Sequence, residues 1–347
     1  MREGRTTVYN NITSPEKLAQ VNPENINLHK DFVDYLRSIG RAGSTIEQYI
    51  SNLNIFWCWN LEFNQNKYFI DLTKRDVVKL QNHCINEFHW SPKRIRTFKA
   101  TLSSLSNYIE NVLDDEYPTY RSIINKIESP PNDMVREKTI FKLEELRPLL
   151  DYLVEHEEYM KACILSLGIN SGRRKSELTR FKSSYFSDDN LLFDGALYKT
   201  PEKIKTKGRG TKGKMLEVYT LAKPFKPYLD LWMKQREKLG IKSEWLFPKC
   251  ENGKWIDEHI SSNTLDSYAK TFSNILKRNF YWHALRHAWT SYMLDQNLPE
   301  SVVQSIQGWS TRDMVSVYDD RPMDSTLEQY FGAGGIKGAE KKSLIDL

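Results

Sequence analysis

The chain has 347 residues, enough for two domains with separate cores, and its hydrophobic fraction of 39% is ordinary for a globular protein. No stretch approaches the roughly 18 to 20 consecutive apolar residues of a membrane-spanning helix, and the first 20 residues lack the apolar core of a signal peptide. We therefore expect a cytoplasmic protein with no membrane partner. Its four cysteines form no CxxC pair and are expected to be buried, reduced thiols. A net charge of +5 is by itself only a weak sign of a polyanionic partner.

Residues 1–26 show no regular hydrophobic periodicity, which predicts a loosely ordered N-terminal arm. Residues 27–127 have the pattern of a helical domain. Apolar side chains recur at helical spacing from Leu28 onwards, and Ser44 and Glu47 have the spacing of a capping box that opens a second helix.

Two further helices are predicted to begin near Thr73 and at Pro92, which follows the capping residue Ser91. The helix after Pro92 carries cations among small and hydroxyl side chains, a face that suits a phosphate backbone. A plain solvent-exposed helix explains this pattern nearly as well. The candidate DNA-contacting side chains on it are Lys93, Arg94, Arg96 and Lys99.

Two adjacent prolines mark residues 128–138 as a linker, because proline stops a helix. Residues 139–335 are then expected to form a second domain, followed by a tail at residues 336–347. We predict a mainly α protein with a small antiparallel β-hairpin or sheet in this second domain.

The predicted hairpin pairs residues 191–193 with residues 215–221 across a basic loop. Between residues 199 and 214 the chain is rich in lysine and has one acid, Glu202. Such a run is a solvated loop about as often as it is a phosphate-binding one. Residues 223–329 are again expected to be mainly helical.

Three separated segments have to be considered together. They are SGRRKSEL at residues 171–178, HALRH at residues 283–287, and Gly308-Trp309 followed nine positions after the tryptophan by Tyr318. Each segment is unremarkable alone, since an arginine pair is more often a surface feature and a tyrosine is more often a packing residue.

The pair His283 and His287 lies on one helix face and has the spacing of a metal-binding pair. A metal site needs a third ligand and usually a carboxylate base, and Ala284 stands where an HExxH site has glutamate. We therefore disfavour a metal site, and we expect His287 to be an ordinary core or surface residue.

In this order the segments resemble the signature of the tyrosine recombinase (phage integrase) family, which includes Cre, Xer and lambda integrase. The resemblance covers most of the chain. It implies a helical core-binding, SAM-like DNA-binding domain at residues 27–127 and a mixed α/β catalytic domain with a C-terminal docking helix at residues 139–335. The catalytic residues that it implies are Arg174, Lys207, His283, Arg286, Trp309 and Tyr318, with Glu177 as a supporting acid.

Two positions depart from the family pattern. Most members have histidine where this chain has Trp309, but some have tryptophan, whose indole N–H can donate to a phosphate oxygen. The catalytic lysine lies on a hairpin that is longer here than usual, and we favour Lys207 by its Thr-Lys context. Lys205 and Lys212 remain alternatives, and both are also expected to contact DNA together with Arg209.

The resemblance implies a site-specific DNA recombinase that works through a 3′-phosphotyrosyl intermediate without cofactor or metal. Its expected partners are double-stranded DNA with a specific recombination site, other copies of itself as a tetramer on two duplexes, and accessory DNA-bending or directionality factors. Such an enzyme is expected at the nucleoid. The alternatives are strand cleavage of the type IB topoisomerase kind, a catalytically silent DNA-binding regulator, and a metal-dependent nuclease.

Overall fold

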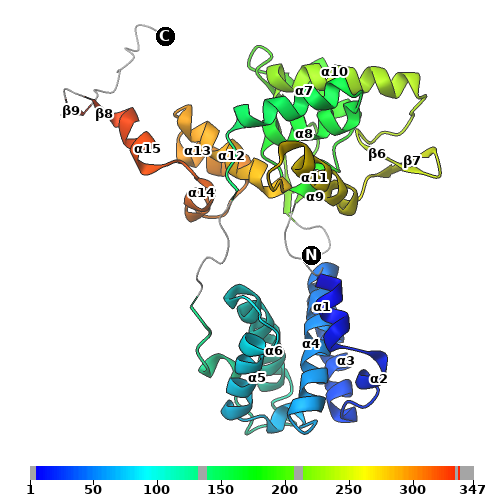
Figure 1. The fold of residues 1–347 in the computed structure, drawn as a ribbon, viewed down its shortest axis with the longest axis vertical. Helices are drawn as coiled ribbons and strands as arrows, with labels where there is room; N and C mark the ends of the chain where they lie inside the picture. The colour runs from blue at the N-terminus through cyan, green and yellow to red at the C-terminus, as the bar shows by residue number, and fades with distance from the viewer. Residues whose placement is uncertain (1–4, 132–138, 207–213, 333–334, 337–347) are drawn as a thin grey trace. The chain divides into compact units, whose positions relative to one another are not determined.

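The computed structural model describes residues 5–131, 139–206, 214–332 and 335–336. These residues form two compact units, each with its own buried apolar core, and the chain passes from one to the other near residue 138 (Figure 1). None of the helices in the described ranges is long and apolar enough to cross a membrane.

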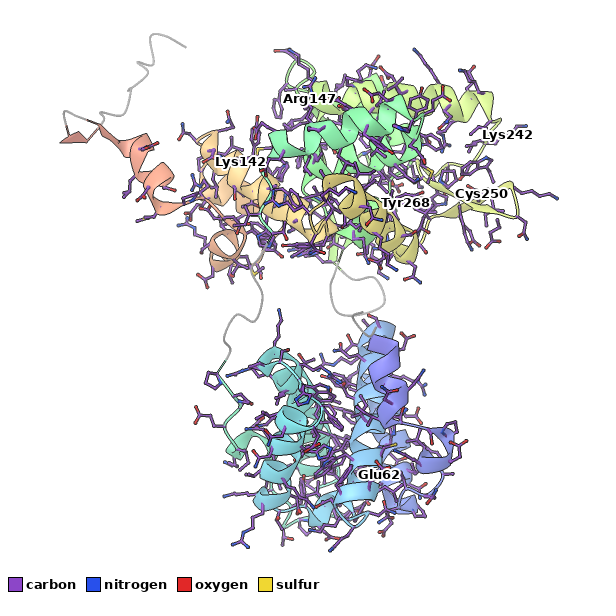
Figure 2. The ribbon with its side chains drawn as sticks, in the orientation of Figure 1. Glu62, Lys142, Arg147, Lys242, Cys250 and Tyr268 are labelled. Carbon is purple, nitrogen blue, oxygen red and sulfur yellow. The ribbon has the colours of Figure 1, made fainter. Side chains whose placement is uncertain are left out.

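The N-terminal unit is helical, as predicted. Its core combines aliphatic side chains with large aromatic rings, and Phe32, Phe56 and Trp57 are almost completely buried. Figure 2 shows how densely the side chains fill the space between these helices. The elements of the unit are α1 (Arg5–Ile12), α2 (Pro15–Leu18), α3 (Pro23–Ser38), α4 (Gly43–Phe63), η1 (Phe69–Asp71), α5 (Lys74–Asn86), α6 (Pro92–Val112) and η2 (Ile124–Lys126), where η denotes a 3₁₀-helix.

Local capping explains where two of the predicted helices begin. At the start of α5 the Thr73 side chain accepts a hydrogen bond from the backbone N–H of Asp76, and the Asp76 carboxylate accepts one from the backbone N–H of Thr73. At the start of α6 the Ser91 hydroxyl accepts from the N–H of Arg94, and Pro92 occupies the first helical position. Both satisfy donors that a helix N-terminus leaves without a partner. The predicted starts at these positions are confirmed.

The prediction of a loosely ordered arm at residues 1–26 is wrong for its described part. Two short helices and the beginning of α3 occupy these residues, and Ile12 and Val21 are buried in the same core as Phe32. Both α1 and α2 contact α4. Helices this short show little periodicity and are stabilised by packing against the rest of the unit, which the local sequence does not reveal.

The predicted capping box at Ser44 and Glu47 is also wrong. Helix α4 begins at Gly43, two residues earlier than a Ser44 cap would allow, and its N-cap residue Ala42 makes no side-chain capping bond. Ser44 is therefore already inside the helix, where its hydroxyl cannot serve as the cap.

A buried histidine makes the stability of the N-terminal unit depend on pH. The indole N–H of the fully buried Trp57 donates to Nδ1 of His29 over 3.2 Å, and burial lowers the pKa of His29 to about 4. An unfolded histidine titrates near its ordinary pKa of about 6.5, so between these two values the unfolded chain binds the extra proton. We expect the free energy of unfolding to fall by about 2 to 3 kcal/mol through this one group as pH drops from about 6.5 to about 4.

The measurement is denaturant unfolding of the full chain, compared with the His29→Asn variant, across that pH range. Asparagine keeps an acceptor for the indole but carries no titratable proton, so the variant should lose this component of the pH dependence. Equal slopes for the two proteins would contradict the prediction.

The C-terminal unit is built around one buried helix. Helix α8 (Tyr159–Ser171) is apolar on all sides, its residues from Ala162 onwards are buried, and it contacts helices α7, α10 and α12. Such a pattern is typical of a helix enclosed by others. The other helices of the unit are η3 (Leu143–Leu146), α7 (Arg147–Glu155), α9 (Lys175–Leu178), η4 (Ser183–Phe186), η5 (Asp188–Asn190), α10 (Ala222–Lys238), α11 (Ser262–Leu276), α12 (Trp282–Asp295), α13 (Glu300–Gln307), α14 (Asp313–Tyr318) and α15 (Met323–Tyr330).

The strands confirm a small antiparallel component but not the predicted pairing. Residues 191–193 and 215–221 do not form one hairpin: β1 and β5 lie on either side of β2 in a three-stranded sheet, and β3 pairs with β4 around the basic loop. A further hairpin, β6 with β7, interrupts the stretch expected to be mainly helical. The strands are β1 (Leu191–Leu192), β2 (Leu197–Lys199), β3 (Ile204–Thr206), β4 (Lys214–Leu216), β5 (Tyr219–Leu221), β6 (Pro248–Glu251), β7 (Lys254–His259), β8 (Phe331–Gly332) and β9 (Gly335–Ile336).

Apart from β7, these strands are only two to four residues long, too short to show a clear alternation of apolar and polar side chains. The prediction for the cysteines is confirmed for Cys58, Cys84 and Cys163, which are buried free thiols. It is wrong for Cys250, which is exposed on the hairpin strand β6.

Candidate active site

The segment at residues 171–178 packs closely against α12 and α13 at the C-terminal end of α8. Gly172 follows the last residue of α8 with a left-handed backbone, φ 62°. A Cβ atom built at this position would lie 2.6 Å from Nε2 of Gln307 and 2.8 Å from the ring of Trp289. Only glycine avoids both the steric conflict and the conformational cost. The close contact brings α8, α12 and α13 together at this point.

Glu177 holds Arg174 at the start of α9. Its carboxylate accepts a hydrogen bond from Nη1 of Arg174 over 3.0 Å and another from the Arg174 backbone N–H over 3.2 Å. The Glu177 side chain is 1% exposed, whereas that of Arg174 is 27% exposed. The arginine therefore has a fixed base and an accessible guanidinium, as the supporting role predicted for Glu177 requires.

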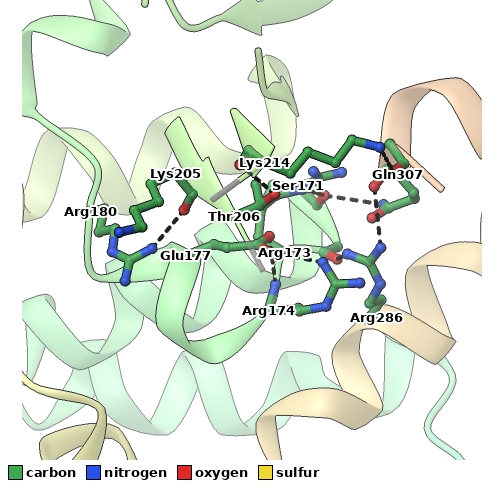
Figure 3. A network of polar contacts seen from close by, with 12 residues as sticks. Ser171, Arg173, Arg174, Glu177, Arg180, Lys205, Thr206, Lys214, Arg286 and Gln307 are labelled. Carbon is green, nitrogen blue, oxygen red and sulfur yellow. Dashed lines mark hydrogen bonds and ion pairs between the residues drawn. The ribbon is translucent and has the colours of Figure 1, made fainter. Parts of the chain in front are cut away.

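Arg286 is completely buried on α12 and bridges the other two segments. Its Nη1 donates to the carbonyl of Gly172 over 3.2 Å, and its Nη2 donates to the carbonyl of Gln307 over 3.3 Å. Burial, together with the smaller effect of the charges of Arg173 and Arg174, lowers the pKa of Arg286 to about 9. The group remains cationic at neutral pH. Figure 3 shows the three arginines in one polar network.

Three of the other predicted catalytic side chains surround Tyr318. The ring of Trp309 stacks on it, with centroids 4.9 Å apart and planes at 11°, and the ring of His283 meets it edge-on at 5.3 Å. The Arg286 guanidinium carbon lies 5.3 Å from the Tyr318 centroid and 4.9 Å from that of Trp309. Tyr318 is 6% exposed. The structure therefore brings His283, Arg286, Trp309 and Tyr318 together from two helices, α12 and α14, and the loop after α13.

Several buried donors around this cluster have no hydrogen-bond partner among the described residues. They are Nε of Arg286, Nη1 of Arg173 and the indole Nε1 of Trp309. Buried donors of this kind are rarely left without an acceptor in folded proteins. Cationic and indole donors together suit an anionic oxygen, such as that of a phosphate.

The structure also identifies two residues near the cluster that the motifs did not single out. Arg173 is completely buried, and it donates from Nε to the Ser171 carbonyl over 3.1 Å and from Nη2 to the Ile306 carbonyl over 3.0 Å. Lys214, on β4, donates from Nζ to the Gly308 carbonyl over 2.6 Å. Only the strand register and the packing of α13 reveal these contacts, since neither residue differs in type from its cationic neighbours in the sequence.

The predicted general acid lies outside the described residues, as do Arg209 and Lys212. Lys207 is the first residue after β3, and Lys205 is exposed on that strand, with its carbonyl accepting a hydrogen bond from Arg180. Lys214 begins the strand on the other side of the loop.

The cations predicted to contact DNA on α6 do not share one environment. Lys93 and Arg96 are exposed, and Arg96 donates to the carbonyl of Pro130 over 2.8 Å. The guanidinium carbon of Arg94 lies 4.2 Å from the centroid of the Trp90 ring, in a cation–π contact.

Lys99 was wrongly predicted to lie on this exposed face. It is 5% exposed, and its ammonium donates to Oε1 of Gln81 and to the carbonyl of Ile127. Burial, and then the charge of Arg96, lower the pKa of Lys99. Its role is structural: it ties α6 to α5 and to the segment that follows η2.

Comparison with known protein families shows which family this chain belongs to. Residues 140–323, more than half of the chain, match the model of the phage integrase family. The chain belongs to the phage integrase family. Residues 28–119 of this recombinase match the family's N-terminal SAM-like domain.

Individual relatives agree with this assignment. The recombinase is 30% identical to the SPbeta prophage-derived recombinase-like protein YomM of Bacillus subtilis over 80% of each chain. It is 23% identical to the tyrosine recombinase XerA of Pyrococcus horikoshii over 85% of this chain and 89% of that protein.

Solved structures share the fold. A XerH recombinase bound to a palindromic difH substrate superposes with a TM-score of 0.61 at 16% identity, over 88% of this chain and 95% of that one. A lambda integrase dimer bound to a COC′ core site gives the same TM-score and identity over 86% of this chain and 96% of that one.

Proposed function

We propose that this recombinase cleaves and rejoins DNA at a specific site through a covalent bond between Tyr318 and a 3′-phosphate. The observation that carries the proposal is the position of the Tyr318 ring, in contact with His283, Trp309 and Arg286. DNA is the partner of this enzyme family, and the site has the donors that a phosphodiester needs.

The charge of the site suits the transition state of phosphoryl transfer. Negative charge accumulates on the non-bridging oxygens as the phosphorus becomes pentacoordinate, and fixed cations stabilise it. Arg174 and Arg286 supply planar, permanently charged donors, and Trp309 supplies a neutral one. Glu177, the acid that contacts Arg174 directly, holds that arginine in place.

In the proposed cleavage step the phenolic oxygen of Tyr318 attacks phosphorus, and the bond from phosphorus to the 5′-oxygen breaks. The phenol loses its proton to His283, the imidazole that faces the ring edge-on. Because the phosphotyrosyl bond conserves the energy of the phosphodiester, attack by a second strand's 5′-hydroxyl reverses the chemistry and reseals DNA.

The leaving 5′-oxygen needs a proton, and we propose Lys207 as its donor. A 5′-phosphorothiolate at the scissile position should therefore restore cleavage by Lys207→Ala, because a thiolate leaves without protonation. The measurement is single-turnover cleavage of oxygen- and sulfur-bridged substrates, with Lys205→Ala, Lys212→Ala and Lys214→Ala as matched variants. Selective rescue of one of those three would move the role to that lysine.

The assembly is proposed to be a tetramer on two duplexes, since strand exchange joins two DNA molecules. Helix α15 supports association in trans because Met323 is 70% exposed and Leu327 is 39% exposed, which leaves apolar surface available for a partner. A helix of this length is not stable alone and is expected to dock on something.

Deletion after Asp324 is accordingly expected to leave binding to a half-site nearly unchanged while abolishing cooperative binding to a full site and strand exchange. Gel-shift titrations on half and full sites measure both quantities. Unchanged cooperativity in the truncated protein would show that the helix packs on its own subunit.

The proposed function is tested by trapping. A nicked suicide substrate should accumulate a covalent protein–DNA adduct that survives denaturation and forms equally well in EDTA. Sequencing the trapped DNA would identify the recombination site. A topoisomerase of the IB type would form adducts without exchanging strands between duplexes, a silent regulator would form none, and a metal-dependent nuclease would stop in EDTA.

A further inference from the structure

The residues immediately after Tyr318 are fastened to α12. The backbone N–H of Asp320 donates to Oγ of Ser291 over 2.8 Å, and its carboxylate oxygen Oδ2 lies 3.3 Å from Nδ1 of His287. One residue further on, Nη1 of Arg321 lies 3.7 Å from Oδ1 of Asp295. Asp320 is thus bound through both its backbone and its side chain, two positions from the nucleophile.

The three residues of α12 that make these contacts are regularly spaced. His287, Ser291 and Asp295 follow one another at intervals of four, so they lie in a row along one face of the helix. The same helix carries His283 and Arg286. Helix α12 therefore carries two active-site side chains, and it also provides a row of contacts for the segment that follows the nucleophile.

Within this row, the contact between His287 and Asp320 is the most buried. The two side chains are 9% and 8% exposed, and the pair lies at ion-pair distance without the alignment of a good hydrogen bond. A buried carboxylate requires a donor or a cation beside it. The carboxylate faces Nδ1, which favours a proton on that nitrogen and so fixes the orientation of the ring.

The oriented ring lies against the nucleophile. The centroids of His287 and Tyr318 are 4.6 Å apart with planes at 43°, and Trp309 stacks on the same tyrosine. Among the residues that the structure describes, no group of three or more His, Cys, Asp or Glu side chains has the geometry of a metal site. The arrangement is a contact between a carboxylate, an imidazole and a phenol ring.

We propose that His287 and Asp320 are a positioning pair: Asp320 orients His287, and both hold Tyr318 where its oxygen can attack. This inference rests on the proposed role of Tyr318 as nucleophile. It assigns a task to a histidine that its sequence context marked only as an ordinary core or surface residue.

The first test is Asp320→Asn, which keeps the size and the backbone contact but removes the charge facing His287. Single-turnover cleavage of a suicide substrate should fall by about 10- to 100-fold, the usual effect of a small misplacement of a reacting group. The dissociation constant for a half-site and the melting temperature should remain close to those of the wild type. Asp313→Asn is the matched control, since this exposed acid lies on α14 with the nucleophile but outside the row of contacts.

Two variants of His287 separate the donor from the ring. His287→Asn retains an N–H near the place of Nδ1, and His287→Phe retains a ring without a donor. We expect His287→Asn to cleave faster than His287→Phe. The double variant His287→Phe with Asp320→Asn should be little slower than the slower single variant, because both disrupt one contact.

A 5′-phosphorothiolate should restore none of these variants, because it assists the leaving group and not the nucleophile. If the wild type forms the Tyr318 adduct and Asp320→Asn cleaves at the same rate, the proposal of a positioning pair is overturned but the proposed function is not. Thiolate rescue of Asp320→Asn would also overturn it, by placing the defect at the leaving group. Absence of any adduct in the wild type would instead overturn the proposed function.

Discussion

Tyr318→Phe is expected to form no covalent adduct with DNA while binding a half-site as tightly as the wild type. The substitution removes only the attacking oxygen, and phenylalanine can keep the stacking on Trp309 at 4.9 Å and the edge contact with His283. The expected loss is complete within the detection limit, because no other group can form the same bond. Denaturing gels of suicide-substrate reactions measure the adduct, and gel shifts measure binding.

Peptide mapping of the wild-type adduct provides the control. Tyr330 lies twelve positions after Tyr318 at the end of α15 and is the nearest tyrosine downstream in the sequence. Adduct mapped to Tyr330, or persisting in Tyr318→Phe, would refute the assignment of the nucleophile.

Replacement of either Arg174 or Arg286 is expected to have the second largest effect on the rate of cleavage. Arg174→Ala or Arg286→Ala should slow cleavage by about 10²- to 10³-fold, or roughly 3 to 4 kcal/mol, the scale for removing one main oxyanion donor. Single-turnover rates at saturating protein measure this loss directly. A loss of less than about tenfold would count against their role in the transition state.

Arg174 and Arg286 also make contacts that stabilise the fold, so their replacement needs controls for stability. Arg174→Ala would leave the buried Glu177 carboxylate without its cation, and Arg286→Ala would leave the carbonyls of Gly172 and Gln307 without their donor. Either change can lower stability as well as activity. Arg174→Lys and Arg286→Lys keep a positive charge but lose the planar fork, and melting temperatures separate folding from catalysis. Arg312→Ala, on an exposed residue beside α14, should retain wild-type cleavage.

Much of the fold and part of the site were predictable because they depend on local sequence. Leu28, Thr73 and Pro92 mark helices through periodicity and capping, which act over one or two turns. The chain segments with Arg174, Arg286 and Tyr318 resembled one family in residue type, spacing and order. The structure then brought Arg286, Trp309 and Tyr318 into contact.

The sequence by itself thus determined the mainly helical class, the family and the identity of the candidate reacting groups, since these follow from residue types at fixed spacing. Only the tertiary structure decided the surroundings of single side chains. It buried Lys99 against Gln81, placed Lys214 on the Gly308 carbonyl, and set Asp320 beside His287 at a separation of 33 positions. A charged side chain has the same spacing in the sequence whether it faces solvent or a buried partner. The packing of helices far apart along the chain makes that choice, because a buried charge is stable only where the fold supplies its partner.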